Sequence, residues 1–449
     1  MPKVDNVGSI KVSEFIDKYY RIFWNNQNID RNTFYPKEQL ITVNRAIIWA
    51  AYKLGMRKYD IRKTVELAGE TSKYHVAGNA SIEDSVMGMG TDYRRQVPCR
   101  VFHGIGNFGT RSGGGAAAAR YTSIQGTPLL SYIFKDLPFV PMIIDETGLE
   151  MPEWISMPFP MMLVNGCSQV GLGKAAYLCE RNINDIVDWL EQNMMNRKDD
   201  DVDYSNCTAI PKPISSTECK VWTNPKNGYI VYEAVINREG KYDVITALPP
   251  KVTEYNLIAT LKKKLPKNVA DRIVDASGEG EPIKIMVPKG YITPDNLAKF
   301  HLQNARKEAP FIWSAELGTM RMSSFEEIAH MWFKARKEIV TKRLESMKSG
   351  LENQIHRIDL IKEFVDNKMS TWKTARIEEY FGKEDSDIVL ECRQRVFLPE
   401  NIGKNEILRE NLTKDIKKID ANIKNIGKFI IKEAREIITK QEDFYKDLS

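Results

Sequence analysis

Apolar residues recur every three or four positions over several stretches of the chain, which is the spacing of an amphipathic helix. This pattern predicts helices over residues 36–56, 59–69, 80–89 and 182–196. Gly55 lies at the end of the first of these segments, where glycine commonly follows the last helical turn. The pattern therefore predicts short helices joined by loops in the first half of the chain.

From residue 323 to the C-terminus the pattern is helical with one interruption. Apolar positions keep a helical rhythm from Ile328 past Phe364, and a short globular segment follows. A second run has spacings of 4, 4, 3, 4, 3 and 4 and consists of Leu408, Leu412, Ile416, Ile419, Ile423, Ile426 and Ile430. Such a repeat predicts a coiled-coil seam, and with it a long antiparallel helical arm. The alternative is an ordinary helical hairpin.

The middle of the chain has a different pattern. Residues 228–236 and 241–248 alternate apolar and β-branched residues on either side of a turn, which predicts paired strands. Residues 151–173 combine prolines with two apolar runs and end in glycines, which predicts extended chain leading into a tight turn. Together with the helical segments, these patterns predict an α+β multidomain protein.

Length and composition limit the classes of protein to consider. A chain of 449 residues has room for about three domains at roughly 150 residues each. Its net charge is only +5, so a basic binding surface has to be local. There is neither an apolar signal core nor a membrane-length apolar run, and we expect a soluble cytoplasmic protein without a membrane partner. The six cysteines and five histidines are scattered, which predicts no metal site and no disulfide framework.

Residues 104–121, GIGNFGTRSGGGAAAARY, combine six glycines, four alanines that favour helix, and a final Arg120–Tyr121 pair. No Asp or Glu occurs from residue 93 to residue 135. The basic residues of that window are Arg94, Arg95, Arg100, Arg111, Arg120 and Lys135. Arginines and exposed backbone amides indicate a phosphate-binding surface, and a tyrosine beside an arginine is a candidate nucleophile toward phosphorus. The alternative for Tyr121 is a role in packing.

Short helices followed by a basic glycine-rich loop fit a helix-turn-helix or winged-helix domain. The pattern GNFGT…AAARYT resembles the active-site segment of type IIA DNA topoisomerases. A second match, PEW…PMMLVNG over residues 152–166, is similar to the eukaryotic and phage forms of that family. In the family, the tyrosine attacks DNA. The resemblance therefore implies that Tyr121 is the nucleophile and that Arg120 binds the neighbouring phosphate.

Further site residues follow from the same resemblance. KYHVAGN resembles the family's KYHPHGD, which implies a catalytic role for His75, although Ala77 and Asn79 depart from the motif. ITVNRAII resembles KPVHRRVL and places Arg45 on a basic motif position; counting back places Arg31 near the scissile phosphate. The alternative for His75 is a structural histidine, and the alternative for Arg31 is a solvated charge in a loop.

The implied DNA-binding set combines the motif matches with the basic window. In the family, an apolar residue of the glycine-rich turn inserts between base pairs, and here the matching residue is Val170, preceded by the departing Gln169. The alternative for Val170 is a packed turn residue. The full set is Arg45, Lys73, Arg94, Arg95, Arg100, Asn107, Arg111 and Val170.

The resemblance is colinear from about residue 31 to the end and implies a domain order. After an N-terminal arm over 1–30, a winged-helix DNA cleavage domain covers 31–165. A mixed α/β tower domain covers 166–322, and a coiled coil with a small helical dimerisation gate covers 323–449. The implied function is cleavage and religation by an ATP-dependent type II topoisomerase. A transient double-strand break, held through a 5′-phosphotyrosyl intermediate, would allow strand passage, relaxation and decatenation.

Partners and cofactors also follow from the family. The sequence has no glycine-rich ATP-binding motif and neither an EGDSA nor a DxDxD cluster, so the resemblance places ATP and Mg²⁺ on a partner subunit with ATPase and TOPRIM domains. Catalysis by this chain alone would be incomplete. We expect a homodimer formed through the winged-helix region and the C-terminal gate, acting on double-stranded DNA, in the host cytoplasm if the chain is phage-encoded. The alternative is a non-catalytic, DNA-bending architectural dimer.

Overall fold

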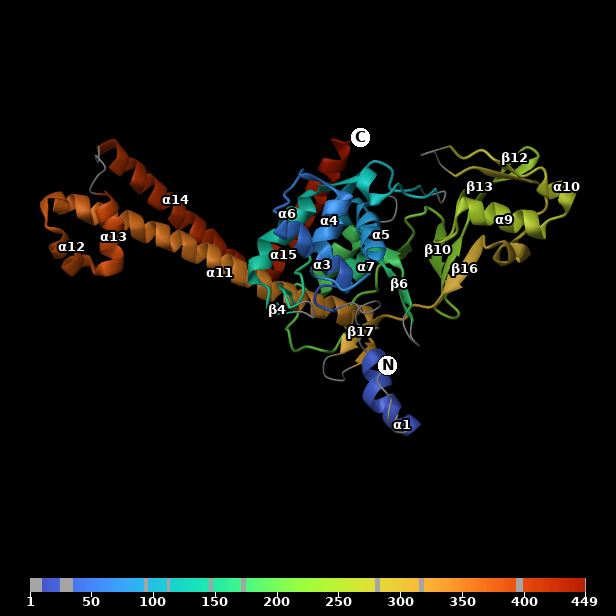
Figure 1. Cartoon of the computed structure of the whole chain (residues 1–449), viewed down its shortest axis with the longest axis horizontal. Coiled ribbons are helices and arrows are strands. Elements are labelled where there is room, and N and C mark those ends of the chain that lie inside the picture. The colour runs from blue at the N-terminus through green and yellow to red at the C-terminus, as the bar shows by residue number, and fades with distance from the viewer. Residues whose placement is uncertain are drawn as a thin grey trace, which may run out of the picture. The chain divides into compact units, whose positions relative to one another are not determined.

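The computed structural model describes residues 10–24, 35–92, 96–110, 114–144, 148–170, 175–278, 283–314, 319–392 and 399–448. It consists of two compact units (Figure 1). The first comprises Met1–Arg336 and Ile431–Ser449, and the second comprises Lys337–Ile430. Helices and strands both contribute, as the predicted α+β class requires. No helix within the described ranges is long and apolar enough to cross a membrane.

The first unit is built around three helices that pack on one another: α3 (Thr42–Lys53), α4 (Thr64–Thr71) and α5 (Asn79–Gly90). Their shared core contains Ile47, Ile48, Leu67 and Ile82, all inaccessible to solvent. These helices confirm the predicted helical segments 36–56 and 80–89, with shorter bounds for the first. Burial of one apolar face of each helix supplies the main stabilisation of this cluster.

A three-stranded antiparallel sheet lies beside these helices, in the order β1 (Ile61–Lys63), β3 (Ser123–Gly126) and β2 (Phe102–Ile105). The predicted helix over 59–69 is wrong in its first half, because residues 61–63 pair with β3 in the register Ile61↔Gln125. A distant strand supplies the backbone partners here, and this tertiary pairing outweighs the local helical pattern.

Further short helices and one hairpin complete this part of the first unit. Its elements are α1 (Val12–Phe15), η1 (Ile16–Tyr20), η2 (Val97–Cys99), η3 (Ala119–Tyr121), α6 (Pro128–Asp136), η4 (Leu137–Phe139), β4 (Met142–Ile144), β5 (Glu150–Pro152) and α7 (Met161–Asn165). The helical α1 and η1 lie within the segment 1–30, which is predicted to be an N-terminal arm. The chain's last residues return to α6, where the Gln441 side chain accepts a hydrogen bond from the Leu129 amide.

Small antiparallel sheets dominate residues 167–322. The hairpins are β6 (Cys167–Val170) with β7 (Ala175–Leu178), β8 (Glu180–Arg181) with β9 (Pro213–Ile214), and β17 (Phe311–Ser314) with β18 (Thr319–Met322). One larger sheet has the order β10 (Lys220–Thr223), β11 (Ile230–Glu233), β16 (Gln303–Arg306), and the other has the order β12 (Val235–Glu239), β13 (Tyr242–Ala247), β15 (Ile285–Pro288), β14 (Val274–Asp275). The strand predicted over 241–248 is confirmed as β13, whereas the segment 228–236 is divided between β11 and β12, which lie in different sheets.

The helices of the same segment are α8 (Ile183–Asn193), α9 (Glu254–Lys264), α10 (Lys267–Ala270), η5 (Pro294–Asn296) and η6 (Ala298–Phe300). The helix α8 confirms the prediction over 182–196, and its N-cap residue Asn182 accepts hydrogen bonds from the Asn184 and Asp185 amides. A buried apolar cluster that includes Ile245, Leu257, Leu261 and Phe300 packs α9 against the four-stranded sheet.

The second unit contains two long helices that run antiparallel. They belong to α11 (Phe325–Asp366) and α14 (Pro399–Lys424), and three ion pairs cross between them: Lys348–Asp420, Asp359–Arg409 and Lys362–Glu406. Along these three pairs the residue numbers rise on α11 and fall on α14, as antiparallel helices require. The helix is interrupted at Asn425, within the predicted apolar repeat, and α15 (Ile426–Lys446) follows.

A small helical core lies between the two long helices in sequence. It is formed with η7 (Met369–Thr371), α12 (Thr374–Phe381) and α13 (Lys383–Cys392), and its buried residues are Leu360, Phe364, Met369, Ile377 and Val389. The predicted short globular segment is therefore present. The compact second unit ends at Ile430, whereas the predicted arm extended to residue 449, because residues 431–449 pack into the first unit.

Candidate functional site

Tyr121 is the last residue of the short helical turn η3, and 68% of its surface is exposed. The Arg120 guanidinium lies over its ring, 4.7 Å from the ring centroid. Both side chains are on the surface, where a macromolecular substrate can reach them. This is the pair that the sequence predicted, and the structure places its two members in direct contact.

Buried residues on either side hold this exposed tyrosine in place. Ala119 is 4% exposed and Thr122 is fully buried. The Thr122 hydroxyl lies 2.8 Å from the Thr64 hydroxyl at the start of α4, and the Thr64 amide donates to the Thr122 carbonyl at 3.2 Å. Sequence reasoning missed Thr122 as a positioning residue. The only signal was its place directly after the Arg–Tyr pair, since the partner Thr64 lies 58 residues away.

The glycine-rich loop owes its path to particular glycines. A Cβ atom added at Gly104 would lie 2.7 Å from the Gly90 carbonyl oxygen and from the Phe108 ring. Gly106 and Gly109 have φ values of +103° and +84°, which side chains disfavour. Asn107 accepts a hydrogen bond from the Gly109 amide through its side chain. These constraints fold the loop back toward the Arg–Tyr pair.

The alanine run does not form the helix that its composition favours. Residues 114–118 have no helical assignment, and only Ala119–Tyr121 make a turn. The Ala117 amide donates instead to the Asn107 carbonyl at 3.0 Å, across the loop. This hydrogen bond within the loop replaces the helical one, so loop closure overrides alanine's propensity.

Several predicted site residues lie outside the described residues: Arg31, Arg94, Arg95 and Arg111. For Val170 the structure describes the backbone, which ends β6 and pairs with Ala175. These positions remain predictions.

Arg45 is placed differently from the prediction of a DNA contact. It is 4% exposed and forms an ion pair with Glu38, which is fully buried. The Arg45 Nε atom donates to Glu38 at 2.9 Å, and the guanidinium also lies over the Tyr35 ring. Glu38 additionally accepts from the Ile155 amide. Arg45 therefore stabilises the packing of α3 through a buried ion pair. A side chain that is buried in this way does not fit a contact with DNA.

The other predicted residues lie in or near the same helical cluster. Lys73 and His75 follow α4 in the turn that leads to α5, and Lys73 is exposed and paired with Glu70 at 2.6 Å. Asn107 is exposed within the glycine-rich loop. Arg100 lies 4.9 Å from the centroid of the Tyr445 ring on α15. The structure thus joins Tyr121 directly with Arg120, and joins its neighbour Thr122 with α4.

Across the described ranges, no group of three or more His, Cys, Asp or Glu side chains is arranged to hold a metal ion. Burial raises the pKa of the Cys167 thiol to about 12, so this thiol is protonated near neutral pH. The chemistry that the described site offers is therefore that of an exposed phenol beside a guanidinium, next to a loop rich in backbone amides.

The comparisons with known proteins identify the family of the chain. Residues 40–435 match the family model that describes the A subunit of DNA gyrase and topoisomerase IV. The chain belongs to this family. The match contains both motif segments, with Tyr121 and Val170, and extends into α15.

Individual relatives are distant in sequence. The DNA gyrase A subunit of Aminobacterium colombiense is 25% identical over 356 residues, which cover 74% of this chain and 43% of that protein. The DNA gyrase A subunit of Borrelia hermsii is 23% identical over 470 residues, which cover 98% and 56%. The DNA topoisomerase 4 A subunit of Neisseria gonorrhoeae is 23% identical over 364 residues, which cover 71% and 47%. The chain thus spans about half the length of these gyrase and topoisomerase proteins.

Proposed function

We propose that this chain is the DNA cleavage and religation subunit of a type IIA topoisomerase, with Tyr121 as its nucleophile. The observation that carries the proposal is the placement of Tyr121, which is exposed, in contact with Arg120, and held between buried Ala119 and Thr122. Membership of the gyrase and topoisomerase IV family supports the same assignment. A nucleophile that attacks a DNA strand has to be both accessible and fixed in position.

The proposed reaction is a transesterification. The Tyr121 oxygen forms a bond to a backbone phosphorus, and the bond from that phosphorus to the 3′ oxygen breaks. The phenol releases its proton, the departing 3′ oxygen takes one up, and the 5′ phosphate remains linked to the protein. One phosphoester replaces another, so the reverse reaction reseals the strand without a further energy source. Two chains, one for each strand, would make a double-strand break and allow strand passage.

Several side chains would stabilise the charge on the reacting phosphate. Arg120 is the first, because a guanidinium can donate two parallel hydrogen bonds to phosphate oxygens. His75 follows α4, the helix whose Thr64 is bonded to Thr122, and is a second candidate. Arg31 is assigned to the same task through its position in the family motif.

The parts of the fold take their roles from this proposal. The helices α3, α4 and α5 with the sheet β1–β3–β2 would be a winged-helix domain that presents Tyr121 to DNA. The sheets of residues 166–322 would be the tower that supports the flanking DNA. The antiparallel helices α11 and α14, with the small core between them, would be the arm and gate through which two copies dimerise.

The remaining components belong to a partner in this proposal. ATP would be bound and hydrolysed by an ATPase domain, and Mg²⁺ would be held by a TOPRIM domain, both on a second subunit. Metal ions assist phosphoryl transfer by stabilising charge on the attacking and leaving oxygens. We therefore expect DNA breaks only when the partner is present.

A trapped-cleavage assay tests the proposal. The chain is mixed with its ATPase/TOPRIM partner, Mg²⁺ and duplex DNA labelled at either the 5′ or the 3′ end, and the reaction is stopped with detergent. We expect protein linked to the 5′ phosphate, lost in Tyr121→Phe and retained in Tyr255→Phe. Tyr255 is a matched control because it is also exposed, at 78%.

Two results would contradict the proposal. An adduct that survives Tyr121→Phe places the nucleophile elsewhere. If the unmodified protein and Tyr121→Phe both bind DNA tightly and neither forms an adduct, the architectural dimer is favoured instead, in which Tyr121 would be inert.

A further inference from the structure

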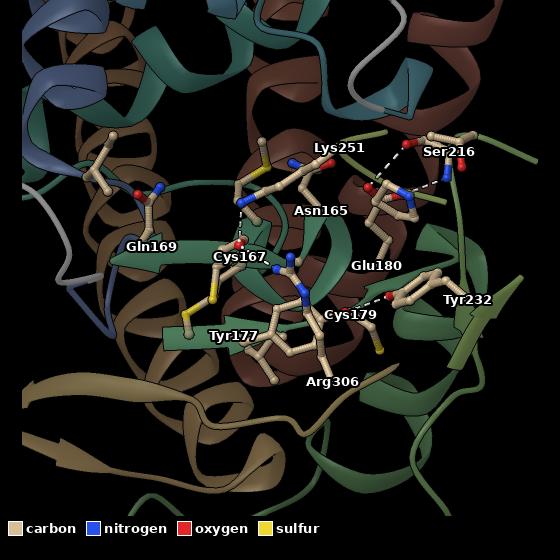
Figure 2. Close-up of a pocket in the computed structure, with 18 of the residues that line it drawn as sticks. Asn165, Cys167, Gln169, Tyr177, Cys179, Glu180, Ser216, Tyr232, Lys251 and Arg306 are labelled. Carbon is tan, nitrogen blue, oxygen red and sulfur yellow. Dashed lines mark hydrogen bonds between the residues drawn. The ribbon is translucent and has the colours of Figure 1, made fainter. Parts of the chain in front are cut away.

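A cleft of about 750 Å³ lies within the first unit, and Tyr121 is not among the residues that line it (Figure 2). Its walls come from the end of α7, the hairpin β6–β7, the turn that precedes α9, and β16. The hairpin β6–β7 is the one whose first strand ends at Val170. The cleft therefore borders the hairpin to which the sequence assigns DNA bending.

Two cations converge inside this cleft on one neutral oxygen. Lys251 Nζ donates to the Ser168 hydroxyl at 2.7 Å, and an Arg306 guanidinium nitrogen donates to the same hydroxyl at 3.2 Å. Figure 2 shows Lys251 and Arg306 reaching toward the same point. Burial and the nearby Arg306 charge lower the pKa of Lys251. Like charges placed this close repel one another, and a bound anion would relieve the repulsion.

No carboxylate among the described residues pairs with either cation. The cleft does contain Glu180, but its oxygens accept hydrogen bonds from the Ser216 amide at 2.8 Å and the Ser216 hydroxyl at 3.1 Å. A second carboxylate of this region, Glu308, is paired with Arg181 at 2.8 Å. The two positive charges at Ser168 are therefore not neutralised from within the described part of the chain.

The backbone at Lys251 is held in a conformation that lysine disfavours. Lys251 has a φ value of +70°, and it is the third residue of a turn closed by a hydrogen bond from the Val252 amide to the Pro249 carbonyl. Proline at the second position and a positive φ at the third are typical of a type II turn, which usually has glycine there. A lysine that occupies a glycine position points to a requirement for its side chain.

Arg306 is also fixed in place. Its guanidinium lies 5.4 Å from the centroid of the Tyr177 ring, and the Tyr177 hydroxyl bonds to that of Tyr232 at 2.8 Å. Tyr177 is the strand partner of Ser168 in β6–β7. A stacked arginine keeps its N–H groups available at the edge of its plane, where they suit a phosphate. Lys251, Arg306 and Ser168 therefore form a preorganised group of donors.

We propose that Lys251, Arg306 and Ser168 bind a phosphate of the DNA backbone beside β6–β7, the hairpin whose first strand ends at Val170. This inference rests on the proposed function of the chain as a DNA-cleaving subunit. Two residues of a strand span roughly 6.7 Å, which equals about two base-pair rises of 3.4 Å each. A phosphate held at Ser168 would thus fix the duplex within about two base steps of residue 170, where bending is expected.

The test measures how DNA binding depends on salt. Each phosphate contact contributes about −0.9 to the slope of log K against log salt concentration. For a duplex of about 30 base pairs, we expect Lys251→Gly and Arg306→Met each to reduce the magnitude of this slope by about one and to weaken binding by about fivefold to tenfold at 0.1 M salt. Glycine suits the positive φ at residue 251, so Lys251→Gly keeps the turn while it removes the charge.

Two controls separate a local phosphate site from a general loss of charge. Lys432→Met removes an exposed charge on α15 that does not line the cleft, and it should leave the slope unchanged. Arg306→Lys keeps the charge and should restore most of the slope. The yield of the covalent Tyr121–DNA adduct is measured in the same proteins, which tests the proposed function independently of the phosphate site.

The outcomes are distinct. Reduced slopes in both cleft variants with an unchanged Lys432→Met slope support the site. Unchanged slopes in proteins that still form the Tyr121 adduct overturn the site and leave the proposed function intact. If the unmodified protein neither binds DNA nor forms the adduct, the phosphate site and the proposed function are both overturned. A last outcome combines two measurements: inorganic phosphate raises the unfolding temperature of the unmodified protein but not of Lys251→Gly, and the two proteins bind DNA equally well. In that case the cleft binds a free anion, and the assignment to DNA is wrong.

Discussion

Arg336 is the residue whose removal we expect to destabilise the first unit most. It is 2% exposed, and it joins three helices: its own α11, α6 through Asp136, and α15 through Glu433. A guanidinium nitrogen also donates to the Ser156 hydroxyl at 2.8 Å. Asp136 lies 200 residues away in the sequence and Glu433 lies 97 residues away, so this cluster joins three segments that are far apart along the chain.

The perturbation is Arg336→Met, which keeps most of the side-chain volume and removes the charge. Two buried carboxylates then lose their cation, and loss of one partner from a buried ion pair typically costs about 3–5 kcal/mol. That loss is a large part of the roughly 5–15 kcal/mol by which a domain is stable. We expect the urea midpoint of the first unit to fall by a corresponding amount, as followed by tryptophan fluorescence, to which the buried Trp332, one turn away on α11, contributes.

A compensating variant shows whether charge is the cause. Arg336→Met combined with Asp136→Asn and Glu433→Gln removes all three charges, and we expect it to recover much of the loss, because no unpaired carboxylate remains. A decrease of less than about 1 kcal/mol in the single variant would refute the reasoning, since it would give this cluster the weight of a surface ion pair. No recovery in the triple variant would show that packing, rather than charge, is what the arginine supplies.

Three further outcomes are expected. Burial lowers the pKa of His103, so the unfolded chain binds more protons as pH falls; the free energy of unfolding should decrease from about pH 7 down to the lowered pKa, and a urea titration of His103→Gln should lose that dependence. Gly104→Ala should destabilise the protein in thermal unfolding, because its Cβ would meet the Gly90 carbonyl oxygen at 2.7 Å, whereas Gly115→Ala, with open space around it, should be neutral. Thr122→Val should cost about 1–3 kcal/mol by leaving Thr64 without its hydroxyl partner, and it should slow formation of the DNA adduct more than it weakens DNA binding; equal effects on both would contradict a positioning role.

Much of this protein could be predicted from local patterns. Helical periodicity alone located α5, α8 and the long α11, because each buries one face and has a clear end. The alternation of apolar residues located β11, β12 and β13. The Arg120–Tyr121 pair and its glycine-rich loop were also visible in the sequence, because their residues are adjacent or close along the chain.

The tertiary structure decided what depends on distant partners. Residues 61–63 became a strand because β3 offered backbone partners, and Ala117 left a helical pattern because its amide met Asn107. The family resemblance implies a DNA-binding role for Arg45, yet its ion pair with Glu38 and the packing of α3 place it in the core. The convergence of Lys251 and Arg306 on Ser168 has no local signal at all. Local sequence determines propensity and the supply of chemical groups, whereas burial and hydrogen bonding between remote segments determine which groups meet, and those contacts exist only in the folded chain.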